Sequence, residues 1–403
     1  MIIKYKKSAL LWFVILFLYS VFSSPFPKVP GLVEMVLGSG LIVAVLSHKN
    51  LFALLQGRVK REDVFSLVSL IIFTYFLIVP SLNFVLGDWE LNDYVRDLVP
   101  LIYLSLPFLI RHGSISSDSR NIFLFGLIFS GVAFSVRYFY ESGLQLNQIG
   151  KIVCFDNDGY YPFDPTVTFS MIYCLCCAFL GKVSLLLRIL LMTSGLVCAA
   201  ALFGVAQRAP IGLLILSMSI LFFAETAFMR LFVVLLVAIA VWIFFEGAIE
   251  SVFSVLIEKQ LVYGDNNKIA EFKDVLSALD TPTKIFFGLG WGALFDSSAY
   301  DGLTSNTHSI ISYFIVKTGA IGSLFLFIYI SFFLVSAVKL FLNDRVLALS
   351  IVSALFIGLL LQPTYKTLSF GILLLVLSQL GGRQNVEFER LGEGDRAFEP
   401  QKN

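Results

Sequence analysis

Five side chains that can carry positive charge stand near the ends of long apolar runs. They are Arg137, Arg208, His308, Lys317 and Lys366. A charge at the edge of a membrane span is costly and is expected to serve a function. Arginine holds phosphate oxygens through paired hydrogen bonds, and histidine can take up a proton near neutral pH. Such groups could together bind a diphosphate at a membrane surface and activate a hydroxyl group for attack.

Four of these residues also have a simpler interpretation. Arg137 could reach the water and pair with Glu141 four residues later. Arg208 could be an interfacial anchor, His308 a solvated histidine, and Lys317 a buried structural lysine or one that faces the cytoplasm. The residue types alone leave these alternatives open.

The local sequence predicts where four of the candidates lie. Pro210 suits the first turn of a helix, which predicts that Arg208 lies at a helix N-terminus, where an anion is favoured. Asn306 or Thr307 is expected to cap the helix that follows His308. Lys317 comes nine residues after His308, which places it roughly 13 Å along that helix. Lys366 is expected at the start of the last helix.

The composition indicates what positions these side chains. The chain has 403 residues, of which 58% are hydrophobic and 14% charged, whereas a soluble domain is nearer a quarter charged. A helix that crosses a bilayer needs about 20 apolar residues. We therefore expect an all-α polytopic integral membrane protein with about twelve transmembrane helices. The expected spans are 8–24, 31–47, 64–86, 95–110, 121–140, 166–181, 184–206, 210–224, 229–246, 309–338, 346–361 and 365–380.

The charges in the loops predict the orientation. Lys and Arg gather in every second loop, as at Lys7, Lys49 and Arg120, and positive loops face the cytoplasm. The intervening loops are acidic or mixed, as at Glu90 and Asp156. The pattern predicts a multi-pass inner-membrane protein with both termini in the cytoplasm.

The expected organisation has one large outward loop. Helices 1–9 occupy residues 1–246, a periplasmic loop 247–307, helices 10–12 residues 308–383, and a disordered cytoplasmic tail 384–403. Within the loop, residues 249–262 and 267–279 favour helices. A glycine-rich stretch follows, with Gly288 and Gly290, and is expected to form a movable lid with those helices.

Several site classes are disfavoured. The net charge of +1 provides no basic field for nucleic acid. The cysteines lie mostly in apolar runs without histidine partners and are expected to be small core residues. The Gly288-Leu289-Gly290-Trp291-Gly292 stretch follows no strand and is not a nucleotide fingerprint. Asp88 and Glu90 are more simply solvated carboxylates than a divalent-cation site. We expect no cofactor and no metal.

These motifs occur in an order that resembles the bacterial O-antigen polymerase and O-antigen ligase superfamily. The turn Gln207-Arg208-Ala209 is similar to the family's Ser-Arg-Gly-like turn. The stretch Gly288-Leu289-Gly290 is similar to the family's Gly-x-Gly, and Thr307-His308-Ser309 to its His-Asn. Gly319-Ala320-Ile321-Gly322 follows on the next helix, and Arg137 with Glu141 matches an Arg-x-x-x-Glu of some ligases. Two departures stand out, because Ser-Arg-Gly is here Gln-Arg-Ala and His-Asn is His-Ser.

The resemblance implies inverting glycosyl transfer outside the cytoplasmic membrane, from an undecaprenyl-diphosphate-linked oligosaccharide. Arg208 and Arg137 would bind the donor diphosphate, with Lys317 adding charge at the leaving group. His308 would orient or deprotonate the acceptor hydroxyl. Lys366, Gly288 and Gly290 would complete the substrate site. The implied partners are the bilayer and, in the same pathway, a chain-length regulator and a flippase.

Two alternatives remain. A ligase would transfer the glycan to lipid A–core rather than polymerise repeat units of O-antigen or capsule. In the family, the position of Lys317 is often basic in polymerases, so this resemblance favours the polymerase. A transporter of lipid-linked glycan would place its charges near the bilayer midplane and often contains internal repeats. The halves of this chain show no convincing repeat, and the charges lie towards one face, which favours an interfacial enzyme.

Overall fold

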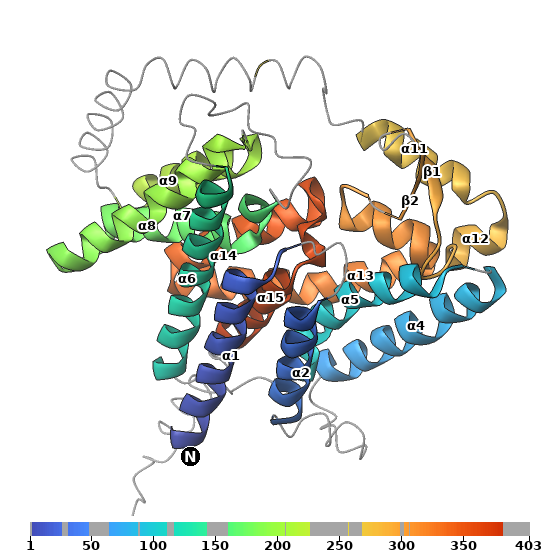
Figure 1. The fold of residues 1–403 in the computed structure, drawn as a ribbon, viewed down its shortest axis with the longest axis horizontal. Helices are drawn as coiled ribbons and strands as arrows, with labels where there is room; N and C mark the ends of the chain where they lie inside the picture. Colours follow the sequence, from blue (N-terminus) through green and yellow to red (C-terminus); the bar gives the residue numbers. More distant parts are fainter. Residues whose placement is uncertain are drawn as a thin grey trace, which may run out of the picture.

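The computed structural model describes residues 2–25, 31–47, 64–87, 89–110, 117–142, 160–205, 207–225, 257, 268–298, 302–305 and 307–381. These parts of the chain are built almost wholly from helices (Figure 1). The first half contains α1 (Ile2–Phe22), α2 (Leu32–Ser47), α4 (Val64–Gly87), α5 (Leu91–Leu109), α6 (Ser117–Glu141), η2 (Tyr161–Phe163), α7 (Pro165–Leu180), α8 (Leu185–Gly204) and α9 (Arg208–Glu225). The second half contains α11 (Lys268–Ala278), α12 (Pro282–Phe287), α13 (Ile310–Asn343), α14 (Arg345–Phe356), η3 (Ile357–Leu361), η4 (Pro363–Lys366) and α15 (Leu368–Gly381).

A helix occupies every expected apolar span that falls in the described ranges. Within the described part of the chain, four helical segments are long and apolar enough to cross a membrane: α4, residues Arg120–Glu141 of α6, α8 and α13. The chain is therefore a mostly helical protein suited to a membrane. The expected span 229–246, the expected helix 249–262 and the tail 384–403 lie outside the described residues. The count of twelve crossings and the orientation of the termini stay predictions.

The helix α15 lies at the centre of the helical assembly. Every residue from Leu368 to Gln379 is buried, and the helix packs against α5, α7, α13 and α14. A helix that is apolar on all sides is stable only when other helices enclose it. This packing fixes the position of η4, the short segment that immediately precedes α15.

A second group of helices, α1, α6, α7 and α8, packs closely together. A Cβ atom added at Gly131 of α6 would lie 2.4 Å from the Thr166 carbonyl oxygen of α7, so the two backbones meet where a side chain is absent. Three cysteines here, Cys174, Cys176 and Cys198, are buried as free thiols, which confirms the expected core role for them. Cys177 is also free and is partly buried.

A buried carboxylate joins these groups. Asp164 caps α7 by accepting a hydrogen bond from the Thr166 N–H. It also accepts bonds from the hydroxyl groups of Tyr19 on α1, at 2.8 Å, and Ser369 on α15, at 2.7 Å. Burial raises the pKa of this carboxyl group. Its hydrogen bonds act in the opposite direction, because they stabilise the ionised form.

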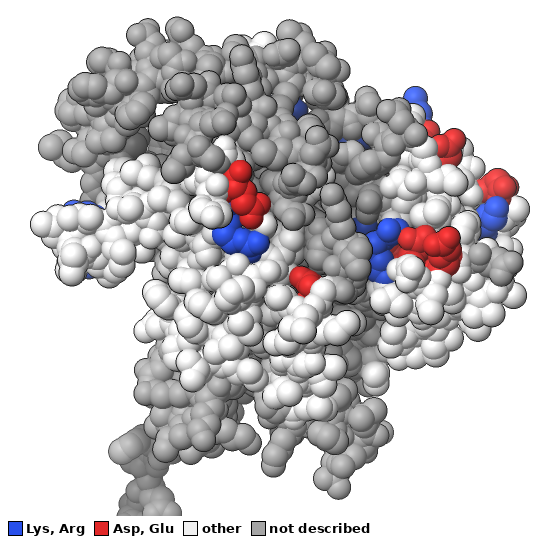
Figure 2. Space-filling view, in the orientation of Figure 1, with Lys and Arg blue, Asp and Glu red and all other residues white. Residues whose placement is uncertain are grey.

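Two strands add to the expected all-helical fold. β1 (Phe295–Ser297) pairs antiparallel with β2 (Gly302–Thr304), and Phe295 lies opposite Thr304. The hairpin follows α12 and leads towards the N-terminus of α13. In Figure 2 the described surface is largely uncharged, and its charged side chains form a few small groups.

Candidate functional site

A buried ion pair lies farther along α13, nine residues after His308. The Lys317 ammonium group lies 2.5 Å from the Asp97 carboxylate of α5, and neither side chain is exposed to solvent. Lys317 also donates a hydrogen bond to the Ala293 carbonyl oxygen, and Asp97 accepts one from the Gly292 N–H at 2.9 Å. The carboxylate of Asp97 thus balances the charge of Lys317 inside the protein, and the contacts of the pair join α5, α13 and the glycine-rich stretch. We therefore assign Lys317 the structural role instead of the expected contact with the leaving group.

The glycine-rich stretch lies between α4 and α13. Gly319 interrupts α13 with a φ of 68°, and a Cβ atom there would lie 2.4 Å from the Phe286 carbonyl carbon. A Cβ atom on Gly288 would lie 2.4 Å from the Lys317 carbonyl carbon, and one on Gly290 would lie 2.7 Å from Asn83 Cβ. Both glycines are thus required for close backbone packing. This geometry argues against the movable lid expected for the stretch and against substrate contact by Gly288 and Gly290.

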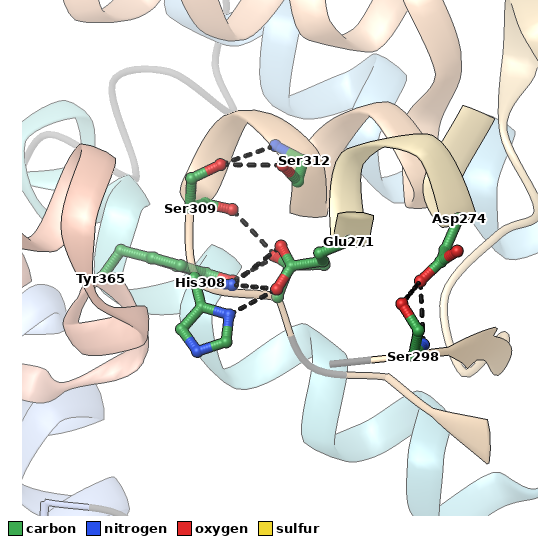
Figure 3. A network of polar contacts seen from close by, with 8 residues as sticks. Glu271, Asp274, Ser298, His308, Ser309, Ser312 and Tyr365 are labelled. Atoms are coloured by element: carbon green, nitrogen blue, oxygen red, sulfur yellow. Dashed lines mark hydrogen bonds and ion pairs between the residues drawn. The ribbon is translucent and has the colours of Figure 1, made fainter. Parts of the chain in front are cut away.

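His308 is held by a carboxylate from the loop. Glu271 on α11 lies 2.5 Å from His308 Nδ1 and also accepts the His308 backbone N–H, with both oxygens at 3.1 Å (Figure 3). The carboxylate is buried, whereas the His308 side chain is 21% exposed. A carboxylate at Nδ1 favours the tautomer with the proton on that nitrogen. The other nitrogen, Nε2, then has the lone pair of a general base, and Figure 3 shows it on the ring edge away from Glu271.

The turn around His308 is built by short polar side chains. Ser309, rather than the expected Asn306 or Thr307, caps α13, and its hydroxyl accepts the Ser312 N–H. The Thr307 hydroxyl donates to the Ser309 carbonyl oxygen and lies 3.5 Å from the Tyr365 hydroxyl of η4. These contacts bring the His308 turn beside the segment that carries Lys366 (Figure 3).

Lys366 stacks on an aromatic ring at this place. Its ammonium nitrogen lies 4.4 Å from the centre of the buried Tyr313 ring. Burial lowers the pKa of Lys366 to about 7; Asp97 opposes the shift, and Lys317 and Arg96 add to it. Lys366 lies between α14 and α15 and is partly buried. Its surroundings therefore disfavour the charged form, and an anion bound beside it would favour that form.

Arg96, which the sequence analysis did not single out, joins this group of cations. Its guanidinium group donates to the Ser305 hydroxyl at 2.6 Å and pairs with Asp93 at 2.7 Å. Its side chain is 53% exposed, so solvent reaches much of this side chain. Arg96 and Lys366 thus lie near the His308 turn, and Arg96 is the more accessible of the two.

Arg137 has a different environment. Its guanidinium group donates to the Ser20 and Ser23 carbonyl oxygens at the end of α1, at 3.0 and 2.5 Å, and to the Tyr161 hydroxyl at 2.7 Å. It also lies 4.2 Å from the centre of the Tyr161 ring. Tyr161 in turn donates to Glu141, so the expected Arg137–Glu141 relationship runs through this tyrosine. The contacts make Arg137 a clamp between α1, α6 and η2, which argues against its expected donor-binding role.

Arg208 is the first residue of α9, at the predicted helix N-terminus, and is partly buried. The preceding Gln207 is buried, and its side-chain Nε2 has no hydrogen-bond partner among the described residues. The helix α9 packs against η3, which also packs against α13 and η4. Thus η3 packs against both α9, which begins at Arg208, and α13, which begins two residues after His308.

The sequence contained a signal for some of the missed residues. Arg96 and Asp97 lie inside the apolar run 95–110, where an ionisable residue should have been treated as a candidate by the same rule that selected Lys317. Glu271 lies on an amphipathic loop helix and carries no comparable signal. Only the packing of α11 against α13 places its carboxylate at His308.

The site can therefore perform two chemical tasks. The Glu271–His308 pair can accept a proton at Nε2, and Arg96 and Lys366 can attract an anion near the same turn. Asp88 of the disfavoured cation site lies outside the described residues, and among those described no group of three His, Cys, Asp or Glu side chains is placed to hold a metal ion. No model of a known protein family matches the chain, and no curated protein matches it either.

Proposed function

We propose that the protein is a membrane glycosyltransferase that acts on an oligosaccharide linked to undecaprenyl diphosphate. In this proposal it polymerises repeat units of O-antigen or capsule at the periplasmic face. The observation that carries the proposal is the Glu271–His308 pair. It lies just before the start of α13, beside the η4 segment that ends at Lys366. The motif order that resembles the O-antigen polymerase and ligase superfamily supplies the substrate class.

The proposed reaction joins two sugars and releases the lipid diphosphate. His308 Nε2 takes the proton of the acceptor hydroxyl, while Glu271 keeps Nδ1 protonated and holds the ring in place. The acceptor oxygen then forms a bond to the anomeric carbon of the donor, with inversion. The bond between that carbon and the diphosphate oxygen breaks, and the electron pair leaves with the diphosphate.

The cations have the role of binding the leaving group. Arg208, at a helix N-terminus, and Arg96, with an exposed guanidinium group, suit the diphosphate oxygens. Lys366 would bind the same charge in its protonated form. The lipid tail of the donor would remain among the apolar helices. All of this chemistry uses energy stored in the donor and needs no nucleotide at the site.

Surface glycan from a deletion strain tests the proposal. Loss of a polymerase leaves core carrying one repeat unit, whereas loss of a ligase leaves bare core and accumulated lipid-linked polymer. For a capsule system the same comparison is made on capsule. Normal glycan in the deletion strain would refute both enzymes, and lipid-linked glycan trapped on the cytoplasmic side would favour the transporter.

Variants in the complemented strain separate the roles of two residues. His308→Ala should lower transfer by about 100-fold or more if the side chain is the general base. Arg208→Ala should abolish long chains while the protein remains in the membrane, and Arg208→Lys should fail as well if a two-pronged contact is needed. Full activity of Arg208→Lys would show that charge alone suffices.

A further inference from the structure

The segment formed by α12 and the glycine-rich stretch lies against long apolar helices instead of extending into water. Leu289 and Gly290 donate their N–H groups to the Val316 and Lys317 carbonyl oxygens of α13, at 2.8 and 3.0 Å. Those carbonyl groups can accept outside bonds because Gly319 interrupts the helix just after them. The loop backbone thus fills the break in α13.

A second break, in α4, is filled by the same segment. Pro80 has no N–H group, so the Phe76 carbonyl oxygen four residues earlier lacks its helical partner. The indole N–H of the buried Trp291 donates to this oxygen at 2.7 Å. Pro80 lies seven residues before Gly87, the last residue of α4, which is about 10 Å below the helix end. In a bilayer crossed by α4, this contact would therefore lie near the edge of the apolar layer.

Every backbone N–H from Gly288 to Ala293 has an acceptor. In chain order the acceptors are the carbonyl oxygens of Lys284, Val316, Lys317 and Pro80, a carboxylate oxygen of Asp97, and the carbonyl oxygen of Gly290. A surface loop in water does not need such complete pairing, because water satisfies its amides. Irregular backbone at membrane depth does need it.

The outer side of α12 is apolar and exposed. Ile285, Phe286 and Phe287 are 47%, 53% and 37% exposed. The helices behind them also expose apolar side chains, such as Leu82 on α4 and Leu324 on α13, at 58% and 57%. The helix α12 packs against α13, and α13 packs against α4. Both α4 and α13 can cross a membrane, so the exposed apolar side chains of α12 lie on the same packed unit as the apolar surfaces of these two helices.

We propose that α12 is an interfacial membrane anchor, with Ile285, Phe286 and Phe287 inserted among the acyl chains of one leaflet. The glycine-rich stretch is then a re-entrant backbone that joins this anchor to α4 and α13. Lys284 pairs with Asp280 at the start of α12, at 2.7 Å, so the charges can remain at the headgroups while the following residues enter the apolar layer. The occupant of this surface is lipid.

Fluorescence quenching in nanodiscs tests the location of α12. The full-length protein, with its native cysteines replaced by alanine, receives a single cysteine at Ile285, Phe286 or Phe287 and an environment-sensitive fluorophore there. Lys273→Cys on the exposed side of α11 is the matched reference. We expect nitroxide-bearing lipids to quench the label at Phe286 at least about twofold more than the label at Lys273, and aqueous iodide to show the reverse.

Each label is read separately, so failure of one variant to fold does not prevent the test. Iodide quenching at two of the three α12 positions that equals quenching at Lys273 would overturn the proposal. Lipid quenching at two of them supports it. The measurement requires no glycan, so its outcome is independent of the proposed enzyme activity.

Discussion

Lys317 and Asp97 form an ion pair of 2.5 Å that is completely enclosed by protein. The pair joins α13 to α5, and its two members also bind Ala293 and Gly292 in the stretch between β1 and α12. One contact therefore holds together two apolar helices and the loop that precedes the His308 turn. A buried pair of this kind matters most when one partner is removed, because the other charge then stays buried alone.

Removal of either charge should therefore destabilise the protein strongly. We expect Lys317→Met and Asp97→Asn each to lower the free energy of unfolding by about 3–5 kcal/mol, measured by thermal unfolding in detergent. Lys284→Met is the matched control, because it breaks a pair whose lysine is 41% exposed and should cost about 0–1 kcal/mol. Equal stability of Lys317→Met and Lys284→Met would contradict the structural role.

Gly319 should tolerate no side chain. Gly319→Ala places a Cβ atom 2.4 Å from the Phe286 backbone, at a positive φ, and should reduce the amount of folded protein in the membrane. Gly212 on α9 has no atom within 4 Å of the same position, so Gly212→Ala should be neutral or stabilising by up to about 1 kcal/mol. Size-exclusion profiles and melting temperatures distinguish the two. A well-folded Gly319→Ala protein would contradict this prediction, because it would show that α13 can continue as a regular helix through residue 319.

Arg137 should affect stability rather than donor binding. Arg137→Ala leaves the Ser20 and Ser23 carbonyl oxygens without their donor and should cost about 1–3 kcal/mol. Arg137→Lys should rescue only partly, since an ammonium group cannot reproduce the planar contacts. The kinetic measurement is transfer per folded molecule over a range of donor concentrations. A large rise in KM with unchanged melting temperature would return Arg137 to the substrate site.

Lys366 predicts a dependence of stability on pH. Burial lowers the pKa of Lys366 in the folded protein to about 7, whereas the pKa of a lysine in the unfolded chain is about 10.4. Between these values the unfolded chain binds more protons, so the free energy of unfolding rises with pH. Lys366→Met should remove this rise, while Lys284→Met should keep it. Melting curves between about pH 6 and 10 provide the measurement, and an unchanged slope in Lys366→Met would refute the assignment.

Glu271 should act only through His308. Glu271→Gln should lower the turnover of the proposed transfer by about tenfold or more, because it no longer fixes the ring tautomer, with a smaller effect on KM. In a His308→Ala protein the same change should have little further effect, since the two residues work as a unit. Glu271→Asp is the conservative control. Equal losses from Glu271→Gln with and without His308 would show a general structural role instead.

The helical class and the approximate positions of the helices could be predicted from the order of the amino acids. Apolar runs as long as 64–86 and 309–338 correspond to α4 and α13 because helix length and membrane compatibility depend on neighbouring residues along the chain. The N-terminus of α9 at Arg208, before Pro210, follows from the same local rules.

The pairing of the charged groups, in contrast, became visible only in the folded protein. Lys317 could be placed on its helix from the sequence, but its partner Asp97 lies 220 positions earlier. The spacing in the sequence predicts a pair between Arg137 and Glu141, yet the Arg137 guanidinium group donates its hydrogen bonds to the end of α1 and to Tyr161. Partner choice depends on how each helix is rotated and packed against the others. That rotation is set by the shapes of buried side chains and glycine contacts across the whole fold, and no local pattern encodes it.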